Sequence, residues 1–429
     1  MKDLMNMNID EYVDSHKEEI INTLLKLISL PSPDGGETAA QSYVENYLWE
    51  LGFETETFRG SFDKCQELSD YCPADIVYHE NCYNVAGKAK GSSHKPSLLL
   101  FAHIDTERED YFGNFDNPYA AIRKDGKIHG LGASDDKGGV AMMLEAARIA
   151  KMFAGDFNYD LTILSILGKH GGAFGTLSAL LKGYGADNCI YLHPAETGHG
   201  FAEIKNISLG IVDFDLETKG IKGAMHDDLD PGINANVVMI KLLNGLEEFN
   251  QQMRRDNIFD FGSFANQPSF ILNIGSIHSE GGYGEVNASC KAKIRCRFFK
   301  PYGIDDIKEL INQKIKETAV NEGYEDLYEL RTGNFKATPA MVASDDEFIM
   351  LIKDAISCKT GIKDFIHQYH GGSDIRFPII YGGSKCVGIG PSCILPVASS
   401  NKQEWIDEND YLNGVKIVAD ILLRLNKEE

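Results

Sequence analysis

Residues 97–105 read SLLLFAHID, and residues 132–139 read GASDDKGG. The first stretch is a continuous apolar run that ends in a histidine and an aspartate. A run of this kind is typical of a strand that is buried on both faces of a mostly parallel sheet. Because side chains alternate along a strand, His103 and Asp105 are expected to project to the same side at its carboxyl end. The stretch therefore predicts an α/β fold with polar residues at the end of a buried strand.

Around this strand the sequence alternates between helical and extended patterns, as stacked βαβ units do. Apolar residues at helical spacing predict helices over 10–29, 37–51, 140–155 and 176–185. Further apolar runs predict strands over 161–168 and 189–192. Buried-strand patterns return over 377–383, FPIIYGG, and over 385–391, KCVGIGP. We therefore expect a mostly parallel, twisted sheet that is flanked by helices.

The pattern changes between these two parts of the chain. Apolar and polar residues alternate over 207–220, 269–280 and 288–300, which indicates half-exposed strands, and 234–253 is helical. A chain of 429 residues is also too long for one compact domain. We predict one domain over 1–203 and 329–429, interrupted by an α+β domain with an antiparallel sheet over 204–328. In the second domain, KAKIRCR (291–297) puts its basic residues on one strand face, which favours a solvated surface over an interface.

Composition excludes several classes of partner. The formal net charge is −22, whereas nucleic acids and anionic membranes attract basic surfaces. The nine cysteines form no CxxC pair, which indicates reduced thiols in a cytosol. The N-terminal residues are polar and acidic, so no signal peptide is visible, and no apolar run approaches the ~20 residues that span a bilayer. We expect a cytoplasmic protein that binds neither nucleic acid nor membrane.

The residues at the predicted strand ends suit a metal site. His103 could ligate a metal beside Asp105, although a buried histidine bonded to a nearby aspartate is common without one. Glycines flank Asp135 before a helix begins, and one carboxylate can bridge two cations about 3.5–4 Å apart. Alone, such a glycine and aspartate cluster is more often a helix cap and turn. Together, the two motifs favour a zinc hydrolase.

Two further motifs extend this pattern, namely KGAMHDDLDPGINAN at 222–236 and GGSDIRF at 371–377. With them, nearly the whole chain resembles the zinc-dependent family of aminoacylase, succinyl-diaminopimelate desuccinylase, acetylornithine deacetylase and carboxypeptidase G. The resemblance implies a catalytic α/β domain and a lid domain that also forms the dimer. It further implies hydrolysis of amide bonds in N-acylated amino acids or small peptides, by two zinc ions and a glutamate general base.

The resemblance assigns roles to five residues that match the family's motifs. His103 would ligate the first metal, Asp105 would orient that histidine, and Asp135 would bridge. His226, in the lid, would help to stabilise the tetrahedral intermediate in a partner's active site. Arg376 would hold a carboxylate of the substrate.

Four positions depart from the family's pattern. The glutamate pair, general base then second-metal ligand, falls on Lys169 and His170. The acidic ligand of the first metal falls on His193, and the last histidine ligand falls near Ser400, a poor zinc ligand. Imidazole is an acceptable replacement for carboxylate in a zinc site.

His103, Asp135 and His193 therefore make a plausible three-ligand set. His170 could add a fourth ligand, which would give either one closed site or a weakened second site. His370 could replace the missing histidine. The alternative is that His170 and His193 are ordinary polar residues at strand ends. The ligand set predicts one zinc ion rather than two, and Mn²⁺ or Co²⁺ would also suit it.

Lys169 raises a question about the reaction. A general base must accept a proton, which a protonated lysine cannot do, although burial beside a cation would favour the neutral amine. Losing a positioned base costs about 10²- to 10⁴-fold in rate. Glu196 and Glu203 could serve as the base instead.

Three hypotheses follow. The chain is a metal-dependent amidohydrolase for a small N-acyl amino acid or dipeptide-like compound, or a homologue that binds a carboxylate-bearing ligand without hydrolysis. Alternatively, it is a mononuclear enzyme with different chemistry, in which Lys169 acts as an acid or an electrostatic clamp. We favour the first, with a small carboxylate-bearing substrate and a homodimer formed through the lid.

Overall fold

The computed structural model describes residues 7–60, 62–68, 70, 82–109, 117–169, 172–195, 197–223, 231–259, 267–394 and 404–427. The chain divides into two compact units. The first comprises Met1–Ile207, Met341–Gln368 and Asp374–Glu429, and the second comprises Ser208–Ala340 and Tyr369–Ser373. The catalytic and lid roles that the sequence suggests for two such domains stay predictions.

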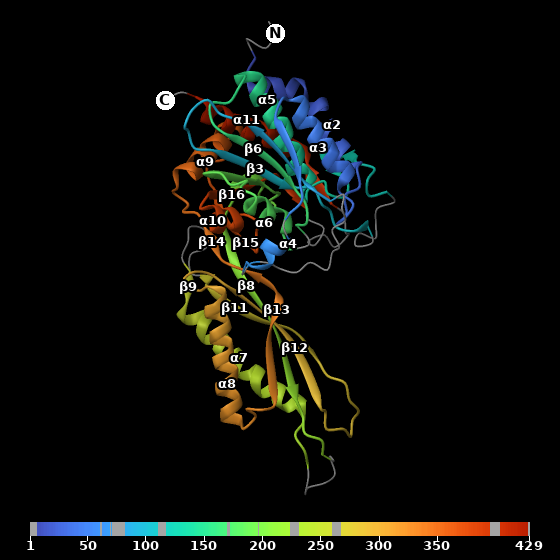
Figure 1. Ribbon diagram of the computed structural model, residues 1–429, viewed down its shortest axis with the longest axis vertical. Coiled ribbons are helices and arrows are strands. Elements are labelled where there is room, and N and C mark those ends of the chain that lie inside the picture. Colours follow the sequence, from blue (N-terminus) through green and yellow to red (C-terminus); the bar gives the residue numbers. More distant parts are fainter. Residues whose placement is uncertain are drawn as a thin grey trace. The chain divides into compact units, whose positions relative to one another are not determined.

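The first unit is built on a mixed sheet whose central strands are parallel (Figure 1). Its strands, in spatial order, are β1 (Glu54–Phe58), β2 (Asn84–Ala89), β6 (Leu161–Ile166), β3 (Leu98–His103), β7 (Asn188–Leu192) and β16 (Lys385–Ile389). The four strands from β6 to β16 run parallel to one another, and β1 and β2 are antiparallel to their neighbours. The predicted α/β fold with a mostly parallel sheet is confirmed.

Helices cover both faces of this sheet. On one face α5 (Lys137–Ala154) packs against β3 and contacts α2 (Lys17–Ile28) and α11 (Glu408–Asn426). The other helices of this side are α1 (Ile9–Ser15), α3 (Thr38–Glu50) and α9 (Glu347–Thr360). On the opposite face lie α4 (Phe62–Gln66), α6 (Phe174–Leu181) and α10 (Arg376–Gly382).

Residues of β3 contribute to two separate clusters of the hydrophobic core. Leu98 and Leu100 belong to the cluster that includes α5, and Leu99 and Phe101 belong to a second cluster that includes Ala179 of α6. The strand is therefore buried on both faces, as its continuous apolar sequence predicts. The same alternation turns His103 to the side of Phe101.

The strand predicted over 377–383 is wrong. These residues lie in the short helix α10, Arg376–Gly382, which ends at Gly383 with a left-handed φ of 64°. A short apolar run bounded by glycine has the same composition in a buried strand and in a buried helix. Pro378 is tolerated here because it lies in the first helical turn, where the backbone N–H has no intrahelical partner.

In the described residues of the second unit, the main sheet has four antiparallel strands and is accompanied by two helices. The strand order is β13 (Tyr328–Ala337), β8 (Glu203–Lys219), β12 (Ser289–Phe298) and β11 (Phe270–His278). The helices α7 (Ala235–Asp256) and α8 (Ile304–Glu322) contribute to the core of this unit. The predicted α+β organisation is confirmed. Among the described helices of both units, none combines the length and the apolar composition needed to cross a bilayer.

The remaining elements are short. They are β4 (Ile122–Lys124), β5 (Lys127–His129), β9 (Ile258–Phe259), β10 (Gln267–Pro268), β14 (Ala340–Met341), β15 (Ile366–Gly371), β17 (Cys393–Ile394), β18 (Trp405–Asp407) and the 3₁₀ turn Gly200–Ala202.

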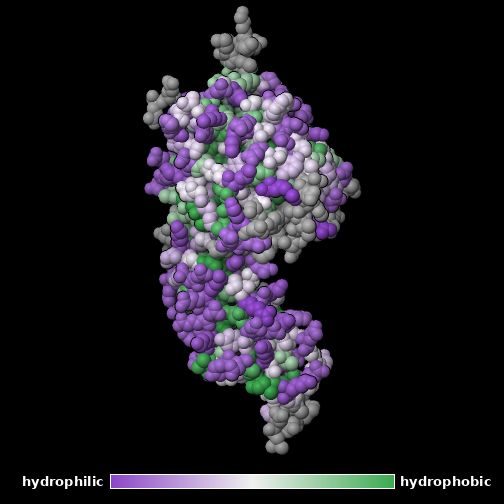
Figure 2. Space-filling model, viewed as in Figure 1, coloured by the Kyte–Doolittle hydropathy of each residue, from purple (hydrophilic) through white to green (hydrophobic). Residues whose placement is uncertain are grey.

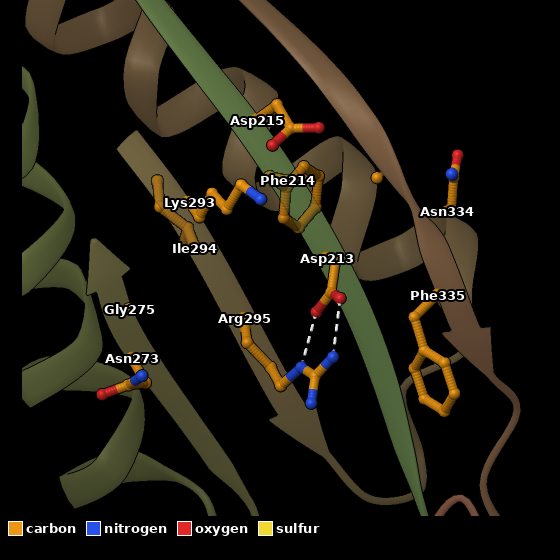
Figure 3. Close-up of a pocket in the computed structure, with 11 residues that line it drawn as sticks. Asp213, Phe214, Asp215, Asn273, Gly275, Lys293, Ile294, Arg295, Asn334 and Phe335 are labelled. Atoms are coloured by element: carbon orange, nitrogen blue, oxygen red, sulfur yellow. Dashed lines mark hydrogen bonds and ion pairs between the residues drawn. The ribbon is translucent and has the colours of Figure 1, made fainter. Parts of the chain in front are cut away.

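Charged residues line one face of the second unit's sheet. Figure 3 shows Lys293 and Arg295 on β12 beside Asp213 and Asp215 on β8, in an open depression of about 520 Å³. The Arg295 guanidinium donates hydrogen bonds to both carboxylate oxygens of Asp213, each over 2.7 Å. Lys293 and Arg295 are solvent-exposed. Lys293 and Arg295 of KAKIRCR therefore lie opposite acidic residues of the neighbouring strand.

The stability of the first unit is expected to fall in mild acid because of His367. This buried ring lies 3.0 Å from the Asn206 side-chain oxygen, and burial, together with the nearby Lys353, lowers its pKa from 6.5 to about 4. Between these pKa values the unfolded chain binds a proton that the folded chain excludes, so stability is lost as the pH falls from 6.5 to about 4.

Chemical unfolding at several pH values tests this expectation. His367→Gln should remove up to about 3 kcal/mol of the acid-induced loss, at 1.36 kcal/mol per pKa unit. His94→Gln, at an exposed position, is the control. Equal acid sensitivity of the wild type and His367→Gln would contradict the assignment.

Candidate metal centre

The two histidines of the centre lie at the ends of neighbouring parallel strands. His103 is the last residue of β3, and His193 follows β7 directly. Phe101 pairs with Tyr191 across these strands, so the residues two positions later reach the same level. Both histidines are buried, with exposed fractions of 0% and 3%. The parallel register thus brings together residues that are far apart in the sequence.

Asp135 enters between the two histidines from the loop that precedes α5. Its Oδ1 lies 2.8 Å from His103 Nε2 and 3.3 Å from His193 Nε2. A Cβ at Gly139 would lie 1.9 Å from the Leu192 carbonyl oxygen, so only glycine allows α5 to begin this close to the end of β7. The glycines of GASDDKGG therefore permit the close packing that positions Asp135.

Hydrogen bonds orient the ring of His103 so that its Nε2 is the nitrogen available to a metal ion. Its Nδ1 lies 3.1 Å from the Asp105 carbonyl oxygen and 3.5 Å from the Asp105 Oδ1. Because a carbonyl oxygen only accepts, Nδ1 carries the hydrogen, and Nε2 faces Asp135. Burial opposes the charged ring, but hydrogen bonds to Asp105 and Asp135 outweigh it and raise the pKa of His103 well above its usual value. A cation at Nε2 would displace a proton there.

Glu404 holds the loop that carries Asp135. This buried carboxylate accepts hydrogen bonds from the backbone N–H groups of Gly132, Ser134 and Asp135, over 2.7, 2.8 and 2.8 Å. Burial raises the pKa of Glu404 to about 7, and Asp135 adds to the effect, against the three backbone donors. Glu404 was not among the predicted site residues, although it is the glutamate that follows Ser400 by four positions in the family's pattern.

The residues of this centre fit a divalent metal ion by type and by position. One ligand atom from each of His103, Asp135 and His193 lies within 4.8 Å of the other two. Two imidazole nitrogens and one carboxylate oxygen form one of the donor sets that bind zinc in catalytic sites, where a fourth position stays open. His103 would bind through Nε2 and Asp135 through its carboxylate. The position of His193 fits, but its hydrogen bonds differ from those of His103.

Lys169 lies beyond the end of β6, at the same edge of the sheet. Ile166, three residues earlier, is the register partner of His103. The Lys169 amine is ion-paired with the buried carboxylate of Asp374 over 2.7 Å, and the Thr176 hydroxyl donates to the other Asp374 oxygen over 2.6 Å. Burial raises the pKa of Asp374, but Lys169 and Arg376 lower it below its usual value. Lys169 is therefore fixed by its ion pair with a buried carboxylate.

Arg376 is almost completely buried, with 1% of its surface exposed. Its Nε lies 3.8 Å from Asp70 Oδ1, and its guanidinium carbon lies 3.9 Å from the centre of the Phe377 ring. The role of Arg376 in holding a substrate carboxylate stays a prediction. Glu203, an alternative base, accepts hydrogen bonds from Thr197.

The other predicted site residues lie outside the described part of the structure. His170, Glu196, His226 and Ser400 belong to the segments that are not described, as does the side chain of His370. The predicted roles of His170 and His226 remain predictions.

Sequence patterns did not reveal Asp374 or Lys205 as parts of this region. Asp374 stands two residues before the arginine of GGSDIRF, which was the only signal. Lys205 is a buried residue of β8 whose amine lies 2.9 Å from His193 Nδ1. A lysine near the start of a predicted strand carries no local sign of such a contact.

A family model matches most of this chain's sequence. The model of the peptidase family M20/M25/M40 matches residues 99–424. N-formyl-4-amino-5-aminomethyl-2-methylpyrimidine deformylase of Bacillus subtilis is 36% identical over 190 residues, which cover 43% of this chain and 40% of the relative. The enzyme of the same name from Halalkalibacterium halodurans is 29% identical over 329 residues, covering 72% of this chain and 69% of the relative.

Solved structures share the fold. The aminopeptidase PepT of Bacillus cereus has a TM-score of 0.74 and 17% sequence identity, and the match covers 96% of this chain and 99% of that chain. At this identity the likeness extends to the fold alone. The match to the Bacillus subtilis deformylase spans less than half of that relative's length.

The described geometry predicts that the protein binds zinc at this centre. His103→Ala and Asp135→Asn should each weaken zinc binding by more than the about 10- to 100-fold that loss of an outer partner causes. Metal content by mass spectrometry and competition with a chromophoric chelator measure the effect. His94→Ala is the control, because His94 is exposed and precedes the start of β3, whereas His103 is the last residue of that strand. Zinc binding that survives both substitutions would contradict the assignment.

Glu404→Gln should weaken zinc binding without removing a ligand. The amide has one acceptor oxygen where the carboxylate has two, so it cannot bind all three N–H groups of the loop equally well. We expect an about 10- to 100-fold loss in zinc affinity, as for other outer partners of metal sites. An unchanged affinity would show that the loop does not need Glu404 to position Asp135.

Proposed function

The chain belongs to the peptidase family M20/M25/M40, and on that premise we propose that it is a metal-dependent amidohydrolase. Its substrate would be a small N-acyl amino acid or a dipeptide-like compound. The observation that carries the proposal is the group of two buried histidines, His103 and His193, with the half-buried Asp135 at the carboxyl edge of the parallel sheet.

We assign different roles to the residues of the centre, some in binding the metal ion and others in orienting its ligands. A bound zinc ion would act as a Lewis acid toward the carbonyl oxygen of the amide. His103 and Asp135 would hold the ion, Asp105 fixes the ring of His103, and Glu404 fixes the loop of Asp135. One ion is favoured over two, and Mn²⁺ or Co²⁺ would suit the same donors.

Lys169 would place a positive charge at the position where the family's pattern has the general base. In its ion pair with Asp374 the amine is an ammonium group, which has three donors and no acceptor. It would therefore stabilise negative charge that develops on the substrate, in the manner of an oxyanion-hole donor. This position also suits a substrate that carries a carboxylate.

The same ion pair favours a second candidate function. If the reaction needs a base at this position, a fixed ammonium group would leave a protein that binds a carboxylate-bearing ligand without hydrolysis. This protein would bind the ligand saturably, and metal removal would not abolish binding.

We also propose that the protein is a cytoplasmic homodimer that forms through the second unit. The resemblance to the family supports the dimer, as do the exposed hydrophobic side chains Val237, Ile240, Ile277 and Val320 of that unit. Figure 2 shows hydrophobic patches among the hydrophilic residues on its visible face. Eight described cysteines carry free thiols, which supports a reducing compartment.

Turnover by the zinc-loaded protein tests the function. A panel of N-formyl, N-acetyl and N-succinyl amino acids, N-formylated aminopyrimidines and dipeptides should contain a substrate whose hydrolysis is detected by mass spectrometry. Chelation and His103→Ala should abolish the reaction. Saturable binding of a panel compound without turnover would instead support the second candidate.

Lys169→Met should lower kcat about 10²- to 10³-fold, which is the usual cost of losing one donor to a developing oxyanion. Lys182→Met is a matched control, because Lys182 forms an ion pair with Glu56 on the surface of the same unit. An unchanged kcat in Lys169→Met would rule out the electrostatic role. A rise in KM alone would assign Lys169 to substrate binding.

A further inference from the structure

Lys205 contacts the Nδ1 side of the His193 ring, and a glycine on the neighbouring strand leaves space for its side chain. It is 1% exposed, and its amine lies 2.9 Å from His193 Nδ1 and also donates to the Pro194 carbonyl oxygen. The register partner of Lys205 on β16 is Gly388, where a Cβ would lie 3.1 Å from the Lys205 Cβ and 3.3 Å from its Cδ. Glycine at 388 thus makes room for the aliphatic part of the lysine side chain.

The contact determines which nitrogen of His193 carries hydrogen. An ammonium group only donates, so the nitrogen that faces it must accept. In a neutral imidazole one nitrogen accepts and the other carries the hydrogen. Nδ1 of His193 therefore accepts from Lys205, and Nε2 carries its hydrogen toward Asp135 Oδ1, 3.3 Å away.

His193 differs in this respect from His103. The Nδ1–H of His103 donates to a carbonyl oxygen, which is the usual arrangement behind a metal-bound histidine. For His193 to bind a metal through Nε2, its hydrogen would have to move to Nδ1. Two N–H groups would then face each other across the contact with Lys205.

We propose that Lys205 is a positioning residue that keeps His193 as a hydrogen-bond donor to Asp135 and thereby limits its use as a metal ligand. The inference rests on the proposed metal centre and concerns the chain's own hydrogen bonds. The ion is then held chiefly by His103 and Asp135. His193 binds the ion only when its hydrogen bond with Lys205 is broken.

Zinc affinities of four proteins test this proposal in a double-mutant cycle: the wild type, Lys205→Met, His193→Ala and the double variant. Lys205→Met should bind zinc about 10- to 100-fold more tightly than the wild type, because His193 becomes free to ligate. In the His193→Ala background, Lys205→Met should change the affinity by less than about 3-fold.

Two results of this cycle would overturn the proposal. One is a Lys205→Met protein that binds zinc no more tightly than the wild type. The other is an equal gain in both backgrounds, which would assign the effect to the charge of Lys205 instead of the ring of His193. Asn206→Leu is the matched control, because Asn206 is the next residue of β8, equally buried, and bonds to the Val342 carbonyl. It should lower stability and leave zinc affinity unchanged.

Nitrogen NMR of the wild-type imidazoles gives a second measurement that needs no variant and no metal. His193 should show an acceptor-type Nδ1 and a hydrogen-bearing Nε2, and the reverse would refute the proposal. This result is independent of turnover, so a failure of the hydrolase proposal and a failure of the Lys205 proposal can be told apart. If the wild type binds little zinc and Lys205→Met binds it well, the proposal is supported although the native centre is weak.

Discussion

The close approach of α5 to the end of β7 is the constraint on which the rest of the centre depends. The backbone of Gly139 lies against the carbonyl oxygen of Leu192, in a space that no Cβ could enter. The loop before the helix is thereby brought between two parallel strand ends, and Asp135 reaches both histidines. Glu404 then holds this loop through three backbone N–H groups. Packing of the backbone, more than attraction between side chains, decides where the ligands meet.

Two lysines place positive charge beside the predicted ligands of this chain. Lys169 is bound to Asp374, and Lys205 is bound to His193, so each positive charge has a defined place near the predicted ligands. The resemblance puts acidic residues at the positions of Lys169 and His193. The predicted metal environment is therefore less negative than in the family's pattern, which would lower its affinity for a cation and favour an anionic substrate.

The sequence predicted those parts of the structure that local patterns encode. The apolar run before His103 is a strand buried on both faces, and the glycine-flanked Asp135 precedes a helix. The run over 377–383 was misassigned because its length and composition fit both a buried strand and a short helix. Glu404 and Lys205 were missed for another reason. Glu404 bonds to a loop about 270 residues earlier in the chain, and Lys205 contacts a residue that follows β7, from which β8 is separated by β16. A single sequence records no such pairing.

The 17-residue strand β8 has a consequence for how this chain can vary in length. In its second half Phe214 and Leu216 are buried in the core, while Asp213 and Asp215 lie on the opposite, charged face. Deleting one residue shortly before them would exchange the two sets, because side chains alternate with a period of two. Most substitutions at these positions would disturb one contact. A deletion would turn every later side chain of the strand to the opposite face of the sheet. Natural insertions and deletions in related genes should therefore avoid β8 and accumulate in loops.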